Sequence, residues 1–188
     1  RGIIMSLYHD SQAKDSCGFG LIAQLKGVQS QQLIKTAISA LTRMTHRGAI
    51  NSDGKTGDGC GISIQISATF FNPIAQALGA NPESLLAVGQ LFLNPDESLA
   101  DQSRKILEKE IRKETLQVIG WRDVPHNQKV CGEVALKSVP KSEQIFVQSP
   151  AVWGKDDFER RLFMARRRAA DKINVEQYYV CSLSNKLI

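Results

Sequence analysis

A cysteine followed by a glycine-punctuated apolar run is the feature that most constrains this chain. Residues 17–23 read Cys-Gly-Phe-Gly-Leu-Ile-Ala, and residues 1–16 before them are polar and lack a usable apolar pattern. The apolar run predicts a strand over residues 18–25, ended by a turn at Lys26-Gly27. The glycines on either side of Phe19 let other backbone approach closely, which suits a reacting centre and equally suits a simple bulge.

The thiol of Cys17 has two interpretations. A thiolate is a strong nucleophile, but a cysteine of ordinary pKa, about 8.5, needs a base to ionise at neutral pH. If the chain is cleaved before Cys17, its own α-amino group, with a reference pKa of about 7.7–8.0, can be that base, as in N-terminal-nucleophile enzymes. We therefore predict that residues 1–16 are a leader and that Cys17 is the nucleophile. The alternative is a small buried core cysteine, which is the commoner case.

The rest of the chain mixes helix and strand patterns without strict alternation. Apolar residues at helical spacing predict helices over residues 31–47, 69–78, 95–114 and 157–173. Alternating or short apolar runs predict strands over residues 62–66, 85–93, 117–121, 133–139, 144–148 and 178–183. Ile62, Ile64 and Ile66 alternate with polar residues, which indicates a sheet with one buried face. We expect an α+β fold in which helices cover stacked sheets.

The composition excludes several classes of protein. Of the 188 residues, 42% are hydrophobic and 23% are charged, which is ordinary for a soluble globular protein. No apolar run approaches the roughly 20 residues of a membrane helix. The N-terminus also lacks the apolar length of a secretory signal. We therefore expect a cytoplasmic protein with no membrane partner.

The four cysteines are far apart and form no Cys-x-x-Cys pair: Cys17, Cys60, Cys131 and Cys181. Structural zinc sites usually contain such close pairs, so we predict no metal site. Without an export signal, reduced thiols are expected rather than disulfides. Cys60 is interpreted as a small packed residue.

Much of the net charge of +5 lies in residues 160–172, which contain five arginines and Lys172. A basic stripe of this kind can bind nucleic acid, so a nucleic-acid-binding domain is one alternative. No aromatic platform or known binding motif accompanies the stripe. A solvated helix face, with no nucleic-acid partner, is therefore favoured.

Two further segments carry residue types suited to chemistry. His46-Arg47-Gly48 is either a cationic helix end with a glycine cap or a guanidinium aimed at an anionic centre. Residues 54–61 contain four glycines, which permit tight turns near a site. Gly54-Lys55-Thr56 imitates the end of a P-loop, but that pattern needs glycine in place of Ala49 and a following helix. A nucleotide-phosphate loop is therefore rejected.

Several ordered segments together resemble the start of the large subunit of bacterial glutamate synthase, which is its class II glutamine amidotransferase domain. Residues 17–23, 43–49 and 53–61 carry most of the resemblance. It continues through residues 120–125, 144–147, 159–163 and 179–185, and covers the chain from about Leu7 onward. No single segment is specific, but their common order is.

The resemblance implies a four-layer αββα sandwich of the Ntn-hydrolase type, with residues 1–16 as a propeptide and residues 17–188 as the N-terminal portion of the amidotransferase domain. It implies that Cys17, exposed as the first residue, attacks the side-chain amide of L-glutamine. A glutamyl thioester then forms, ammonia leaves, and water releases glutamate. Arg47 and Gly48 match the His-Arg-Gly segment beside the nucleophile and are implied as supporting residues.

For the whole enzyme, the resemblance implies that ammonia passes to an FMN site in the remainder of the large subunit and there aminates 2-oxoglutarate. Electrons are implied to come through iron–sulfur clusters from a small NADPH-oxidising subunit. No cofactor is expected within residues 1–188.

The chain also departs from the family's pattern. No segment before Ile188 matches the family's arginine for the glutamine carboxylate, its Asn-Gly oxyanion hole or its acidic partner for the substrate amine. We therefore expect the αββα fold to be incomplete at its C-terminal end. The α-amino group of Cys17 is also tied up in a peptide bond, so little glutaminase activity is expected of the chain as it stands. A non-catalytic interaction module with the same fold is the alternative.

Overall fold

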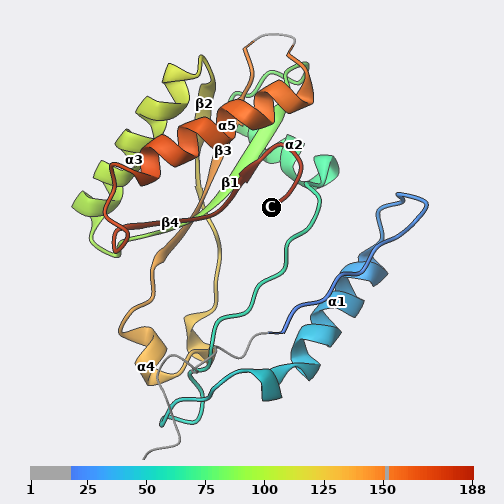
Figure 1. Ribbon diagram of the computed structural model, residues 1–188, viewed down its shortest axis with the longest axis vertical. Helices are drawn as coiled ribbons and strands as arrows, with labels where there is room; N and C mark the ends of the chain where they lie inside the picture. The colour runs from blue at the N-terminus through green and yellow to red at the C-terminus, as the bar shows by residue number, and fades with distance from the viewer. Residues whose placement is uncertain (1–17, 151–152) are drawn as a thin grey trace, which may run out of the picture. The chain divides into compact units, whose positions relative to one another are not determined.

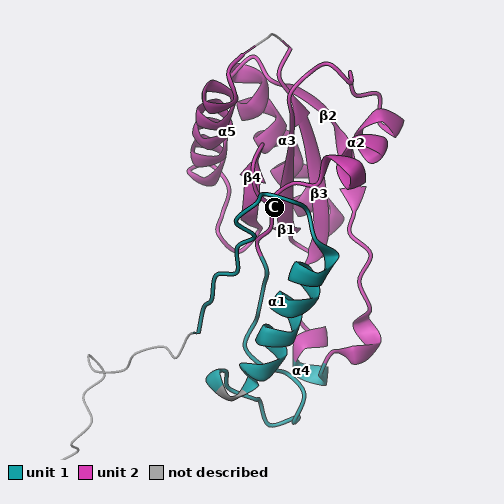
Figure 2. Cartoon of the chain, turned by 90° about the vertical axis from the view of Figure 1, so that its right-hand side faces the viewer, with its two compact units in different colours: residues 1–62, 132–134 teal, residues 63–131, 135–188 magenta. Residues whose placement is uncertain are grey.

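The structure, a computed structural model, describes residues 18–150 and 153–188. The chain divides into two compact units (Figure 2): residues 1–62 with 132–134, called unit 1, and residues 63–131 with 135–188, called unit 2. The leader predicted over residues 1–16 and the nucleophile predicted at Cys17 both lie outside the described residues.

Unit 2 is built on one antiparallel sheet of four strands (Figure 1). The strands are β1 (Leu86–Leu93), β2 (Gln117–Asp123), β3 (Lys141–Gln148) and β4 (Tyr178–Ser184). Their order in the sheet is β2-β3-β1-β4, so β1 and β3 are central and β2 and β4 are edges. All four were predicted, and the α+β class is confirmed.

Two long helices, α3 (Glu97–Lys113) and α5 (Lys155–Ala170), cover one face of this sheet (Figure 1). The apolar residues of α5 recur at intervals of three and four, so they form one stripe, and this stripe is buried. Together with the sheet it forms the larger core, which includes Leu91, Leu93, Leu107, Ile111, Ile145, Val147, Phe158 and Leu162. Helix α2 (Ala68–Ala77) contributes a smaller cluster on Val88 and Phe146, through Phe71 and Ala75.

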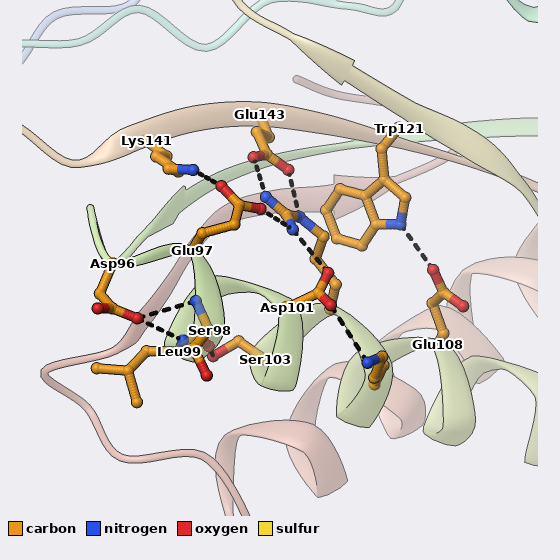
Figure 3. A network of polar contacts seen from close by, with 12 residues as sticks. Asp96, Glu97, Ser98, Leu99, Asp101, Ser103, Glu108, Trp121, Lys141 and Glu143 are labelled. Carbon is orange, nitrogen blue, oxygen red and sulfur yellow. Dashed lines mark hydrogen bonds and ion pairs between the residues drawn. The ribbon is translucent and has the colours of Figure 1, made fainter.

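A polar network ties α3 to the sheet (Figure 3). Asp96 caps the helix by accepting hydrogen bonds from the N–H groups of Ser98 and Leu99, at 2.9 and 3.1 Å. Glu143 is buried on β3 and accepts two hydrogen bonds from Arg104, at 2.9 and 2.6 Å. This bidentate pair satisfies a carboxylate that would otherwise be costly to bury.

A second ion cluster joins α3 to α5. Glu110 is fully buried and accepts hydrogen bonds from Lys113, Arg168 and Lys172. Hydrogen bonds from Lys113 and then Lys172 lower the pKa of Glu110 to about 2. The carboxylate is therefore charged at neutral pH, and its burial depends on these three cations.

Unit 1 contains α1 (Gln31–Arg43) and the short 3₁₀ helix η2 (Thr45–Arg47). Ser30 caps α1 by accepting the N–H of Leu33 at 3.3 Å. No residue of α1 is fully buried. The apolar residues at helical spacing in and just after it are half-buried: Leu33, Ala37, Leu41 and Met44. The helix ends earlier than predicted, because η2 separates it from Gly48.

Three predicted strands differ in the structure. Residues 18–25 have no strand partner among the described residues, and Gly27, at φ +67°, closes a turn by donating to the carbonyl of Gln24. Residues 62–66 are reduced to one bridge, between Gln65 and Leu187, and the neighbouring Ile64 and Ile188 exchange two backbone hydrogen bonds of 2.8 and 2.9 Å. Part of residues 133–139 forms the short helix α4 (Glu133–Leu136), because Asp53 accepts the N–H of Val134 near its start.

No helix in residues 18–150 or 153–188 is both long and apolar enough to cross a bilayer.

Candidate active site

Gly18, the residue bonded to Cys17, lies against the end of the first helical segment in unit 1. A methyl group built on Gly18 would overlap the terminal methyl of Met44, and would lie 3.7 Å from Cγ and 3.8 Å from Cβ of Arg47. The structure therefore brings the chain next to the predicted nucleophile together with Arg47, one of the two predicted supporting residues.

Arg47 is held by backbone contacts and leaves its charged end available. Its N–H donates to the carbonyl of Met44 at 2.8 Å, and the N–H of Gly48 donates to the carbonyl of Thr45 at 3.3 Å. Within the described part of the chain, the guanidinium of Arg47 has no hydrogen bond or ion pair. An exposed guanidinium on a fixed backbone is suited to contact an anionic group.

The chain after Gly48 forms a small two-rung hairpin. Ile50 pairs with Gly57, and the N–H of Asn51 donates to the carbonyl of Thr56 at 2.7 Å. Gly54 occupies the left-handed region at φ +67°, which permits the tight turn at the tip. A turn rather than a helix follows Gly54, so the structure agrees with rejecting a P-loop here.

Asp58 closes the open end of this hairpin. One oxygen of its carboxylate, Oδ2, accepts the N–H of Ala49 at 2.8 Å, and its own N–H donates to the carbonyl of Ala49 at 3.2 Å. The side chain lies over Gly48, with Cβ of Asp58 only 3.5 Å from the point where a methyl group on Gly48 would sit. The second predicted supporting residue thus lies near a carboxylate that the sequence analysis did not single out.

Asp53 organises the tip of the same hairpin. Its carboxylate accepts the N–H of Lys55 at 3.0 Å, and both the N–H and the hydroxyl of Thr56 at 2.7 and 2.6 Å. It also accepts the N–H of Val134 at 3.1 Å. The hydrogen bonds from the side chain and then the backbone of Thr56 hold the pKa of Asp53 well below its usual range.

The four predicted site features have different outcomes. Cys17 lies outside the described residues, as does the side chain of His46, whereas Arg47 and Gly48 lie in one segment beside Gly18. Asp53 and Asp58 were missed as functional residues. Their signal was the Asp-Gly dipeptides at 53–54 and 58–59, since aspartate often accepts hydrogen bonds from backbone N–H groups near a turn.

The other cysteines do not form a second centre. Cys60, Cys131 and Cys181 are free thiols, and Cys60 is exposed, so its interpretation as a packed residue was wrong. Burial raises the pKa of Cys181, which makes it a poor nucleophile. Across residues 18–150 and 153–188, no three His, Cys, Asp or Glu side chains gather in a way that could hold a metal ion.

The basic stripe on α5 is largely neutralised within the protein. Arg160 pairs with Asp157, Arg161 with Glu114, and both Arg168 and Lys172 with Glu110. Cations that are already paired contribute less to binding a phosphate backbone. These contacts favour a structural role for the stripe over nucleic-acid binding.

Comparison with known families identifies the chain. The family described as "Glutamine amidotransferases class-II" matches residues 17–188, so the match begins at Cys17. The chain belongs to the class II glutamine amidotransferases. As a class II amidotransferase domain it has the Ntn-hydrolase type of fold, and the sheet of unit 2 with α3 and α5 supplies one sheet and one helical layer of that architecture.

Curated relatives of this amidotransferase are all similar to it over nearly its whole length. It is 38% identical over 187 residues to the glutamate synthase [NADPH] large chain of Azospirillum brasilense. This match covers 96% of this chain and 12% of the relative. It is 37% identical to ferredoxin-dependent glutamate synthase 2 of Synechocystis sp., and 35% identical to ferredoxin-dependent glutamate synthase 1 of Arabidopsis thaliana. The chain spans 11% of the length of each of these two relatives.

Proposed function

We propose that this chain is the glutamine-hydrolysing part of a glutamate synthase large chain. The observation that carries the proposal is the family match from Cys17 onward, combined with Arg47 lying beside Gly18, the residue bonded to Cys17. The substrate is L-glutamine, and the products of this part are glutamate and ammonia.

The reaction proceeds in two balanced steps. After removal of residues 1–16, the α-amino group of Cys17 takes the proton from its thiol, and the thiolate attacks the side-chain amide carbon of glutamine. The carbon–nitrogen bond breaks, and the departing nitrogen takes the proton from the α-amino group. Ammonia is released, and a glutamyl thioester on Cys17 remains. Water then attacks the thioester, which releases glutamate and restores the thiol.

Arg47 is proposed to support this chemistry electrostatically. Its guanidinium has no partner in the described part of the chain, and its backbone N–H donates to the carbonyl of Met44 at 2.8 Å. A fixed cation near the nucleophile favours the thiolate and the negative charge that develops during attack. Gly48 is proposed to support it as the residue that follows Arg47 in the turn, next to the side chain of Asp58.

For the complete protein we propose that the ammonia aminates 2-oxoglutarate in the remainder of the large chain. FMN and iron–sulfur clusters would supply the reducing chemistry there, with NADPH as electron donor through a small subunit, and the protein is proposed to be cytoplasmic. The donor NADPH is supported by the name of the Azospirillum relative.

Labelling with an electrophilic glutamine analogue tests the proposal. The complete gene product is incubated with a diazoketone analogue of glutamine, digested and mapped by mass spectrometry. We expect a single adduct on a peptide that begins at Cys17, and no adduct in the variant Cys17→Ser. Labelling of another residue, or none, overturns the assignment.

The same experiment separates the alternative of a non-catalytic interaction module. That alternative is supported by exposed apolar side chains in unit 1, including Phe19, Leu21 and Leu25. A module of this kind would show no adduct and no release of ammonia from glutamine.

A further inference from the structure

We propose that Asp58 is a positioning residue, which holds the turn of Arg47 and Gly48 in place near Gly18, the residue bonded to Cys17. The inference rests on the proposed glutaminase function and adds a residue to it. Asp58 is distant in sequence from Cys17 and from the His-Arg-Gly turn. Its proposed role rests on the hydrogen bond that its carboxylate accepts from the N–H of Ala49, nine residues earlier, at 2.8 Å.

Three consecutive N–H groups determine the path of the chain at this point. Those of Arg47 and Gly48 donate to Met44 and Thr45, within the same short helical turn, so they set the shape of the turn itself. The third, on Ala49, donates to Asp58 and is the first that ties the turn to another segment. Loss of this bond would leave the end of the turn attached through the longer 3.2 Å backbone bond from Asp58 to Ala49.

The side chain of Asp58 has no competing role among the described residues. Its carboxylate forms no ion pair there, and its single hydrogen bond is the one from Ala49. It also lies near Gly48, since Cβ and Oδ2 of Asp58 are 3.5 and 3.6 Å from the point where a methyl group on Gly48 would sit. The carboxylate is therefore placed to act on the backbone of residues 47–49 rather than on a distant charge.

The contact with Gly18 transmits this restraint toward the nucleophile. Cβ and Cγ of Arg47 lie within 3.8 Å of the Cβ position of Gly18, so a shift of the turn moves the groups next to Cys17. A misplacement of about 1 Å in a catalytic centre can reduce the rate by about a hundredfold. Because the backbone bond between Asp58 and Ala49 remains, we expect a loss of about tenfold when only the carboxylate is removed.

The test compares variants that remove the acceptor or the donor of this one bond. In the complete gene product, Asp58→Ala removes the acceptor, and Ala49→Pro removes the donor. The backbone of Gly48, at ψ 157°, is compatible with a following proline. Asp58→Asn keeps an oxygen that can accept the bond. Lys55→Ala is the matched control, since Lys55 is exposed in the same loop and its side chain has no partner in the described residues.

Steady-state glutaminase kinetics are expected to separate these variants. We expect kcat to fall about tenfold in Asp58→Ala and in Ala49→Pro, with KM for glutamine within about threefold of the parent. The double variant should lose no more than either single variant, because both remove the same bond. Asp58→Asn and Lys55→Ala should remain within about threefold of the parent in both parameters.

Several results would overturn the inference while leaving the proposed function intact. These are full kcat in Asp58→Ala, an Asp58→Asn variant as slow as Asp58→Ala, or additive losses in the double variant. If Asp58→Ala loses its folded circular-dichroism signal, Ala49→Pro is compared with Asp58→Asn instead. Equal kcat in these two variants would then overturn the inference. A parent protein that releases no ammonia from glutamine contradicts the proposed function itself.

Discussion

The carboxylate of Asp53 accepts a hydrogen bond from the backbone N–H of Val134, 81 residues further along the chain, at 3.1 Å. The same carboxylate binds the N–H groups of Lys55 and Thr56 and the hydroxyl of Thr56. One side chain therefore joins the tip of the hairpin that follows Gly48 to the start of α4. Several backbone donors on one carboxylate favour its charged form, which agrees with the low pKa of Asp53.

Removal of the Asp53 carboxylate should loosen the start of α4. In Asp53→Ala, we expect hydrogen exchange at Val134 and Thr56 to speed up about tenfold at pH 7, since each amide loses its acceptor. Hydrogen-exchange mass spectrometry measures this. Asp123→Asn, an exposed aspartate of β2, is the control and should leave both amides unchanged.

The same contact should weaken in acid. The pKa of Asp53 is lower in the folded protein than in the unfolded chain, so its contribution is fully present above the unfolded value, about 3.9, and is lost as pH falls toward the folded value. Protection of Val134, corrected for intrinsic exchange, should therefore fall below about pH 4 in the parent protein. A pH-independent protection factor would contradict this.

Gly132 should not tolerate a side chain. A methyl group there would overlap the hydroxyl of Thr56 and the carboxylate of Asp53, and would lie 2.6 Å from the backbone nitrogen of Thr56. We expect Gly132→Ala to destabilise the protein by about 1–3 kcal/mol and to reproduce the fast exchange of Asp53→Ala. Gly61→Ala, at a position with open space around the new methyl group, is the control. Unchanged exchange at Val134 in Gly132→Ala would show that this close packing is absent.

Neutralising Glu110 should destabilise the pairing of α3 with α5. Glu110→Gln leaves three cations without their buried partner, and we expect a loss of about 3 kcal/mol in the free energy of unfolding at pH 7. Asp157→Asn breaks an exposed pair on α5 and should cost less than about 1 kcal/mol. Urea denaturation measures both variants.

The contribution of Glu110 also has a defined pH range. Its pKa is lowered from 4.5 to about 2, so the contribution is complete above about pH 4.5 and disappears as pH falls through about 2. The difference in stability between the parent and Glu110→Gln should therefore shrink between pH 4.5 and pH 2. A constant difference over this range would contradict the assignment.

Gly89, in the middle of β1, should be sensitive to any added atom. A methyl group there would lie 2.7 Å from Cγ2 of Ile145 and 3.0 Å from Cδ1 of Leu183, both in the larger core. We expect Gly89→Ala to cost about 1–3 kcal/mol, because buried side chains in the centre of the sheet have little freedom to move. Thermal unfolding compares it with Gly59→Ala, whose new methyl group would meet nothing within 4 Å.

Arg47 should matter to catalysis more than to stability. We expect Arg47→Ala to lower kcat/KM for glutamine about a hundredfold, and Arg47→Lys to recover part of it because the charge remains. Lys35→Ala, an exposed cation on α1, is the control. Equal activity in Arg47→Ala and the parent would remove Arg47 from the site.

Long periodic segments of unit 2 were predictable from the sequence. The helix predicted over residues 95–114 corresponds to α3. Its acidic first turn, its basic last turn and its start at Asp96 can all be recognised in the sequence. The four strands of the sheet also carry apolar runs bounded by turn residues. In these segments local propensity and tertiary burial favour the same structure.

Short segments were harder, because contacts distant in sequence decide them. Residues 133–139 have an apolar pattern typical of a strand. In the structure, however, the N–H of Val134 donates to Asp53 and lies in the first turn of α4. Residues 18–25 have the composition of a strand, but a strand requires a hydrogen-bonded neighbour. No such neighbour is present among the described residues.

The sequence by itself determined the family and the chemistry expected of it, since Cys17, Arg47 and Gly48 stand in an ordered set of segments that few unrelated proteins share. Only the tertiary structure decided which N–H groups the two carboxylates of this loop bind. Asp53 and Asp58 look alike in sequence, each followed by glycine in the same loop. They differ because one faces the N–H of Val134 and the other the N–H of Ala49, and the partner of a hydrogen bond depends on how distant segments fold together.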